Sequence, residues 1–126
     1  MIDKNSIIYQ LVTDRFENSD GNLEKVRDDQ DYESKLTQPM GGTFKGIELR
    51  ADYLSSLGIT HLMMSPVERC KRSCYHGYST TRPGLINLSF GGDLALKKLM
   101  AELKRRDIHT ILDFACLATG KTPLIR

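Results

Sequence analysis

The sequence predicts an α/β fold built on a parallel sheet, because apolar runs of strand length alternate with segments of helical periodicity. Three apolar runs, at 7–12, 59–64 and 108–115, have the length of buried strands. Between them, apolar residues recur three or four positions apart, as on one face of a helix. The resulting order of strand, helix, strand, helix, strand is typical of a parallel sheet with helical crossovers.

The first half of this pattern is the run at 7–12 and the helix after it. The run is apolar nearly throughout, which predicts a strand buried on both faces. Residues 17–43 are polar and contain an acidic cluster, which predicts a loop. Gly58 lies where the first helix would end. The apolar positions of that helix are Ile47, Ala51, Leu54 and Leu57.

The second half begins with the run at 59–64, which Pro66 stops. Residues 70–83 predict a long loop, and Asp93 is a candidate cap for the second helix. One face of that helix is apolar and the opposite face carries lysines and arginines. Its apolar positions are Leu96, Leu99, Met100 and Leu103.

Three parallel strands are too few for a closed barrel, which needs eight strands and about 250 residues. Alone they leave two unpaired edges and one uncovered face, which strands this apolar tolerate poorly. We therefore expect either a piece of a larger barrel or a sheet that something else covers. Composition alone would also fit a small doubly wound domain.

Length and charge set further bounds. The 126 residues are expected to form one domain, 1–126, with 18 basic and 16 acidic side chains and a net charge of +2. This balance gives no electrostatic case for nucleic acid or a membrane surface. No apolar run approaches the roughly 20 residues of a membrane span. The first residues lack the apolar core of a signal peptide, so a cytoplasmic location is the default expectation.

Cysteine usage favours free thiols over a metal site. Cys70 and Cys74 lie four apart in a basic loop with His76 nearby, and Cys116 follows the last apolar run. One histidine beside two cysteines is not the full tetrahedral set that structural zinc requires. Two loop thiols and one buried thiol is the favoured interpretation.

Five short motifs occur in a fixed order along the chain. They are IYQLVTDRF at 8–16, Gly41-Gly42, Ser65-Pro66, YHGY at 75–78 and ILDF at 111–114. In this order and spacing they resemble the opening of the α-amylase superfamily, glycoside hydrolase family 13, over roughly residues 6–120. The resemblance implies an α/β fold that is a partial (β/α)8 TIM barrel, about its first three strands and two helices.

The resemblance also implies where a sugar would bind, since barrel chemistry sits at the carboxyl ends of the strands. The family's counterpart of YHGY lies over the sugar cleft, so His76 would donate to sugar hydroxyls and Tyr78 would offer a ring face. Asp14, Arg15 and Asp113 fall at strand ends and are expected to be structural. From the residues alone, a loop aromatic and a solvated histidine remain the alternative.

The third strand end departs from the family's pattern. Relatives usually have Asp-x-x-x-Asn-His there, whereas this chain keeps Asp113 and has Leu117 and Ala118 in the last two positions. Leucine has no oxygen for a cation and alanine has no donor for a sugar hydroxyl. We therefore expect this strand end to have lost its share of the site.

A calcium site is a weaker expectation. Asn18, Asp20 and Asn22 follow Arg-Phe, as calcium-binding loops do in some relatives, so calcium is the one cofactor that the resemblance suggests. Those relatives continue to Gly-Gly-Asp, but here Gly42 is followed by Thr43. Loops rich in Asx residues are also common because they turn well, and we favour that interpretation.

Catalysis is not expected of the isolated chain. Retaining glycosidases need two carboxyls about 5 Å apart, and in this family they lie on later strands, beyond Arg126. Asp14 beside Arg15 is expected to be a framework residue and not a substitute. The first hypothesis is therefore the N-terminal part of an enzyme that hydrolyses or transfers α-linked oligosaccharides or polysaccharides, with the remainder of the barrel as partner. The second is a non-catalytic amylase-like module that holds a sugar or a protein.

Overall fold

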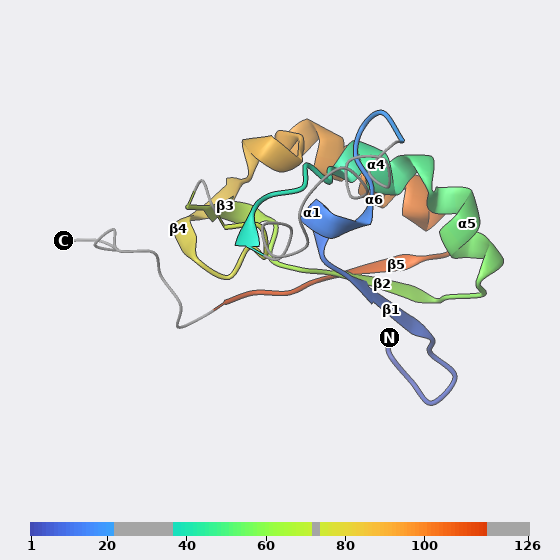
Figure 1. Cartoon of the computed structure of the whole chain (residues 1–126). Coiled ribbons are helices and arrows are strands. Elements are labelled where there is room, and N and C mark those ends of the chain that lie inside the picture. Colours follow the sequence, from blue (N-terminus) through green and yellow to red (C-terminus); the bar gives the residue numbers. More distant parts are fainter. Residues whose placement is uncertain (22–36, 72–73, 116–126) are drawn as a thin grey trace.

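The centre of the structure is a three-stranded parallel sheet in the order β1-β2-β5 (Figure 1). The computed structural model describes residues 1–21, 37–71 and 74–115. The strands are β1 (Ile8–Leu11), β2 (His61–Met64) and β5 (His109–Leu112). Leu11, Met64 and Leu112 are register partners, so the three carboxyl ends meet at one edge. The predicted parallel α/β fold is confirmed.

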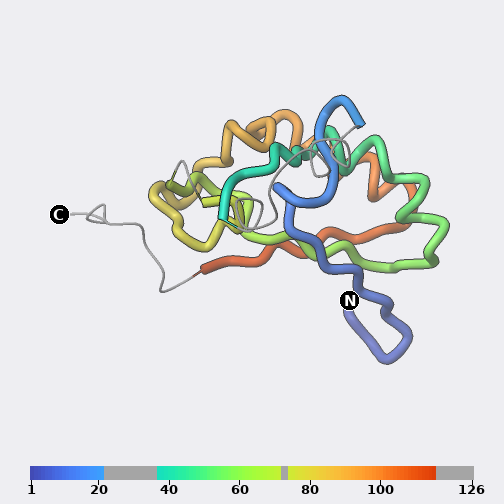
Figure 2. The backbone as a smooth tube through the Cα atoms, in the orientation of Figure 1, coloured from blue at the N-terminus to red at the C-terminus, as the bar shows by residue number. Residues whose placement is uncertain are grey.

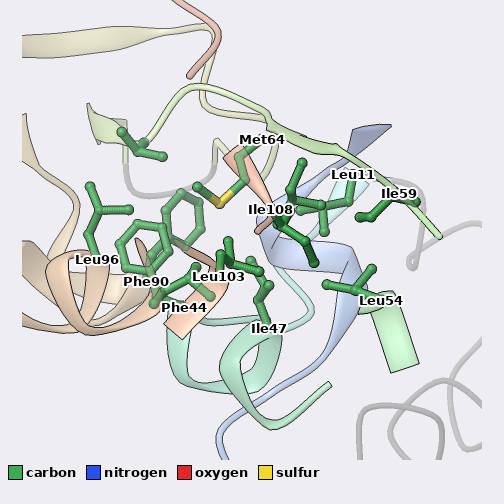
Figure 3. Close-up of a cluster of buried hydrophobic side chains, with 13 residues drawn as sticks. Leu11, Phe44, Ile47, Leu54, Ile59, Met64, Phe90, Leu96, Leu103 and Ile108 are labelled. Atoms are coloured by element: carbon green, nitrogen blue, oxygen red, sulfur yellow. The ribbon is translucent and has the colours of Figure 1, made fainter. Parts of the chain in front are cut away.

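Helices cover one face of this sheet, as the ribbon and the backbone trace both show (Figures 1 and 2). They are α4 (Phe44–Leu49), α5 (Ala51–Ser56) and α6 (Gly92–Arg105), and a short α1 (Thr13–Phe16) follows β1. The hydrophobic core fills the space between the helices and the sheet (Figure 3). Within it the rings of Phe44 and Phe90 meet edge to face, 5.8 Å between centroids.

The first predicted helix has the right position but the wrong boundaries. It starts earlier, at α4, where the Thr43 hydroxyl accepts a hydrogen bond from the Gly46 N–H at 3.0 Å. Arg50 adopts a non-helical conformation between α4 and α5, so two short helices replace the single one. Gly58 has a φ of 73°, a left-handed conformation that ends α5 as predicted.

The predicted cap of the second helix is wrong. The N-cap of α6 is Gly91, with a φ of 115°, and it makes no side-chain cap. A 3-10 turn, η1 (Leu88–Phe90), leads into the helix. Asp93 lies in the first turn and pairs with Lys97 at 2.6 Å. Of the predicted apolar face, Leu96, Leu99 and Leu103 are buried, whereas Met100 is 38% exposed.

Part of the predicted loop 70–83 is an antiparallel hairpin instead. It pairs β3 (Glu68–Cys70) with β4 (Thr80–Ile86). The register shifts on both sides of Arg69, because β4 contains extra residues there: 83–85 on one side and Thr81 on the other. Because proline and glycine are depleted in strands, the sequence did not predict β4 as a strand.

The predicted burial of the first strand on both faces is wrong for the described residues. Ile8 is 45% exposed, and Leu112 and Phe114 on the other edge are 42% and 57% exposed. Within the described ranges no helix lies against the face that carries Ile8, and β1 and β5 form the edges of the sheet, where Leu112 is exposed. Two raw edges and one open face are what a three-stranded piece of barrel was expected to show. No helix among the described residues is long and apolar enough to cross a membrane.

Candidate functional site

The first strand end is organised by the buried carboxylate of Asp14, which is 3% exposed. It accepts hydrogen bonds from the backbone N–H groups of Met40 at 2.8 Å and Gly41 at 3.1 Å. The Asp14 carbonyl accepts a third from Gly42 at 2.9 Å. Asp14 thereby holds the end of β1 against residues 40–42, which lie 26 or more positions away in the sequence.

The second glycine of the Gly41-Gly42 motif is required by a close backbone contact. A Cβ at this position would lie 2.1 Å from the Thr13 carbonyl oxygen and 2.5 Å from that of Asp14. Only glycine lets this segment approach the end of β1 so closely. The motifs at 8–16 and 41–42 are therefore two halves of one contact.

Arg15 connects the same strand end to the loop that carries YHGY. Its Nε lies 3.3 Å from the Asp14 carboxylate, and its Nη2 donates to the Gln38 carbonyl at 2.9 Å. The guanidinium lies over the ring of Tyr75, 4.0 Å from the centroid. This cation–π contact fixes the start of the YHGY segment against the end of β1.

Gly77 seats the same segment against the second strand end. Its φ is 84°, and a Cβ there would lie 2.3 Å from the Pro66 carbonyl oxygen. A larger residue would be strained by its conformation and would clash with the backbone. The Ser65-Pro66 and YHGY motifs thus meet directly.

His76 is held in a defined orientation beside Tyr78. The Tyr78 N–H donates to His76 Nδ1 at 3.0 Å, and the two rings stack at 5.8 Å with an angle of 24°. Because Nδ1 accepts, the neutral imidazole carries its proton on Nε2. The Cys74 sulfur lies 3.7 Å from Nδ1 and packs against the ring. The ring therefore has a single donor nitrogen.

Tyr78 is bound to the third strand end. Its hydroxyl donates a short hydrogen bond to the Asp113 carboxylate, whose other oxygen accepts from the Phe114 N–H at 2.8 Å. The Asp113 N–H donates to the Met64 carbonyl at 3.1 Å, which extends the ladder between β2 and β5. The hydrogen bond to Asp113, with desolvation and charge repulsion, raises the pKa of Tyr78 above its ordinary value. The phenol therefore stays protonated and engaged.

The structure thus brings His76, Tyr78 and Asp113 together and joins Asp14 to them through Arg15 and Tyr75. Sequence reasoning gave no role to Tyr75, although it lies next to His76 in a motif that was singled out. Leu117 and Ala118 lie outside the described residues.

The thiol of Cys70 is protonated and hydrogen-bonded to the backbone. The Cys70 thiol donates to the Cys74 carbonyl at 3.0 Å. Burial, with the hydrogen bond and charge of the neighbouring Cys74, raises the pKa of the Cys70 thiol to about 12, so it remains protonated. Cys116 lies outside the described residues. Within the described ranges, no three His, Cys, Asp or Glu side chains converge as a metal site would require.

At the predicted calcium loop the structure shows an Asx turn. The Asn18 side-chain oxygen accepts from the Asp20 N–H at 3.1 Å, and the Asn18 carbonyl accepts from the Gly21 N–H at 3.2 Å. Asn22 lies outside the described residues. The calcium site at Asn18, Asp20 and Asn22 stays a prediction, and the turn accounts for the Asx residues seen here.

Comparison with known proteins agrees with this geometry. The family described as "Alpha amylase, catalytic domain" matches residues 10–122, and the chain belongs to this family. "Alpha-amylase 2" of Dictyoglomus thermophilum is 38% identical over 109 residues, which are 86% of this chain and 18% of that protein. "Alpha-amylase 2" of Schizosaccharomyces pombe is 34% identical over 118 residues, 89% of this chain and 20% of that protein.

Solved structures show the same relationship. The α-amylase of Geobacillus thermoleovorans, solved in complex with acarbose, superposes with a TM-score of 0.71 at 30% identity, over 86% of this chain and 22% of that one. The α-amylase of Malbranchea cinnamomea gives a TM-score of 0.74 at 28% identity, over 86% of this chain and 23% of that one. The fold is therefore part of an amylase-type barrel, and the chain spans about a fifth of the length of these relatives.

Replacing Asp113 with Asn should return the pKa of Tyr78 toward its ordinary value of 10.0, because the acceptor loses its charge. A raised folded-state pKa means that this contact stabilises the fold below about pH 10 and is lost as the pH rises through the folded-state pKa. The titration is measured by NMR at the tyrosine Cζ, with Tyr78→Phe to assign the signal and Tyr53→Phe as a control. An unchanged Tyr78 titration in Asp113→Asn would contradict the assignment.

Proposed function

We propose that this chain supplies the opening part of the barrel of an α-amylase-type glycoside hydrolase and contributes sugar contacts to its cleft. The observation that carries the proposal is the YHGY segment at the carboxyl edge of the sheet. It is supported from all three parallel strands: by Arg15 after β1, Pro66 after β2 and Asp113 after β5. Carboxyl ends of barrel strands are where such enzymes build their sites.

The proposed ligand is an α-linked glucan. Within the site, His76 would donate from Nε2 to a sugar hydroxyl, and Tyr78 would present its ring. The tyrosine is suited to this role because its hydroxyl is engaged by Asp113, which fixes the plane of the ring. The relatives are named α-amylases and one was solved with acarbose, which supports the substrate class.

We also propose that the 126 residues alone do not hydrolyse glycosides. A retaining mechanism needs one carboxylate free as nucleophile and a second carboxyl as acid and base. Asp14 is buried, accepts hydrogen bonds from two backbone N–H groups and forms an ion pair with Arg15. Asp113 accepts from Tyr78 and from its own strand end. These two strand-end carboxylates are therefore committed to the framework.

A non-catalytic module that holds a sugar or a protein is the second candidate. The two unpaired sheet edges leave apolar side chains exposed, Ile8 on β1 and Leu112 on β5, and this is the observation that favours it. A module that holds a sugar would share the sugar contacts of the first candidate and differ from it in chemistry, whereas a module that holds a protein would differ in binding as well.

Sugar binding is tested by titrating the chain with maltoheptaose and with acarbose while recording NMR spectra. His76→Ala and Tyr78→Ala should each weaken binding about tenfold or more, equivalent to about 1.4 kcal/mol, because a donor or a ring face is lost. Tyr53→Ala is the matched control, since Tyr53 is a half-exposed tyrosine on α5. Equal affinities for Tyr78→Ala and Tyr53→Ala would contradict the site.

Catalysis is tested on the pure chain and on a chimera that joins it to the later part of the Dictyoglomus thermophilum relative. The chain alone should release no reducing ends from maltooligosaccharides, whereas the chimera should do so because it gains a carboxylate pair. Turnover by the chain alone would contradict the assignment of Asp14 and Asp113. A folded chimera that binds sugar without turnover would favour the non-catalytic module.

A further inference from the structure

Two arginines of the hairpin have no counter-ion. The structure describes six arginines, and Arg15, Arg50, Arg105 and Arg106 each pair with a carboxylate. The remaining two, Arg69 and Arg82, take part in no ion pair with the described chain. They are direct register partners, one on β3 and one on β4.

Such a pair is unfavourable by itself. Directly opposed residues of an antiparallel ladder have their side chains on the same face, where like charges destabilise the pairing. The Arg69 Nε is in addition buried without a hydrogen-bond acceptor. A buried guanidinium N–H that lacks an acceptor is costly, and within the described residues no carboxylate forms an ion pair with either arginine.

The nearest carboxylate in sequence, Glu68, forms no ion pair with either arginine within the described residues. Glu68 accepts a hydrogen bond from the Gly84 N–H at 2.6 Å, which holds the extra residues of β4 in place. The backbone of Arg69 is likewise fixed, since its carbonyl accepts from the Thr81 hydroxyl at 3.3 Å. Lys71, next to the end of β3, is exposed and forms no ion pair with the described residues, so it adds a third positive charge beside the hairpin.

We propose that Arg69 and Arg82 form a binding site for a phosphate monoester or free phosphate. Two guanidinium groups carry a charge of about +2, and a phosphate monoester carries about −1.5 to −2 at neutral pH. Planar guanidinium groups bind phosphate oxygens in a bidentate manner, here through the terminal N–H groups of the two arginines. This site is independent of the proposed sugar contacts.

The position of the pair makes a sugar phosphate a natural probe. Arg82 follows Tyr78 by four residues, so their Cα atoms lie within about 14 Å of each other at full extension. Glucose 6-phosphate and inorganic phosphate share the group that the arginines would bind, and glucose lacks it.

The test is calorimetric titration of the full chain with these three ligands, at low ionic strength and at a pH above about 7, where the phosphate is mostly dianionic. Inorganic phosphate and glucose 6-phosphate should bind saturably, and glucose should not bind at this site. Tighter binding of glucose 6-phosphate would identify a phosphorylated sugar as the source of the group, whereas equal binding would identify phosphate itself. Absence of saturable binding by both phosphates would overturn the proposal.

Variants separate this site from general surface charge. Arg82→Gln should weaken phosphate binding about tenfold or more, because one bidentate partner is lost. Lys98→Gln on α6 removes one unpaired charge elsewhere and should leave binding unchanged. Arg82→Glu should abolish binding without lowering the Tm, since the new carboxylate lies opposite Arg69 and supplies its counter-ion. Phosphate binding retained in folded Arg82→Glu, or lost equally in Lys98→Gln, would overturn the proposal.

Discussion

The candidate site depends on one buried carboxylate. Asp14 sits at the carboxyl end of the first strand, where burial of a charge is costly unless every lone pair is used. Two backbone N–H groups from 40–41 and the guanidinium of Arg15 meet that demand. Since Arg15 also lies over Tyr75, the same carboxylate positions the loop that carries His76 and Tyr78.

Parallel register supplies the second constraint. Because β1, β2 and β5 run in one direction and are in register, their carboxyl ends present three anchor points to a single loop. Tyr78 reaches the third of these through Asp113, 35 residues away in the sequence. The loop is therefore anchored by the ends of three strands, which suits the rigid sugar contacts that we propose for it.

Much of the scaffold follows from local pattern. Strand periodicity and helix ends are properties of neighbouring residues, so they can be predicted locally. This explains why the sequence predicts the apolar runs at 59–64 and 108–115 and the left-handed Gly58. The hairpin could not be predicted, since β4 contains Pro83 and Gly84, which are untypical of strands, and its pairing with β3 involves register shifts. Burial of β1 was overestimated, because an apolar strand does not itself reveal which of its faces has a neighbour.

For the candidate site, the sequence suggested individual residues but not the contacts between them. His76 and Tyr78 were expected from the resemblance, whereas the bond between Tyr78 and Asp113 joins segments that no local rule connects. The unpaired Arg69 and Arg82 were hidden for the same reason, as their opposition appears only once two strands pair.

The most direct test of this account is the effect of Asp14→Asn on the loop. The amide loses the charge that Arg15 needs and turns a donor toward backbone N–H groups, so stability should fall by about 2–4 kcal/mol. NMR spectra of the folded variant should show displaced resonances for Tyr75, His76 and Tyr78 with maltoheptaose binding weakened about tenfold, while amides of α6 keep their positions. Asp93→Asn, on an exposed ion pair, should change neither. Unaltered YHGY resonances and sugar affinity in Asp14→Asn would contradict the account.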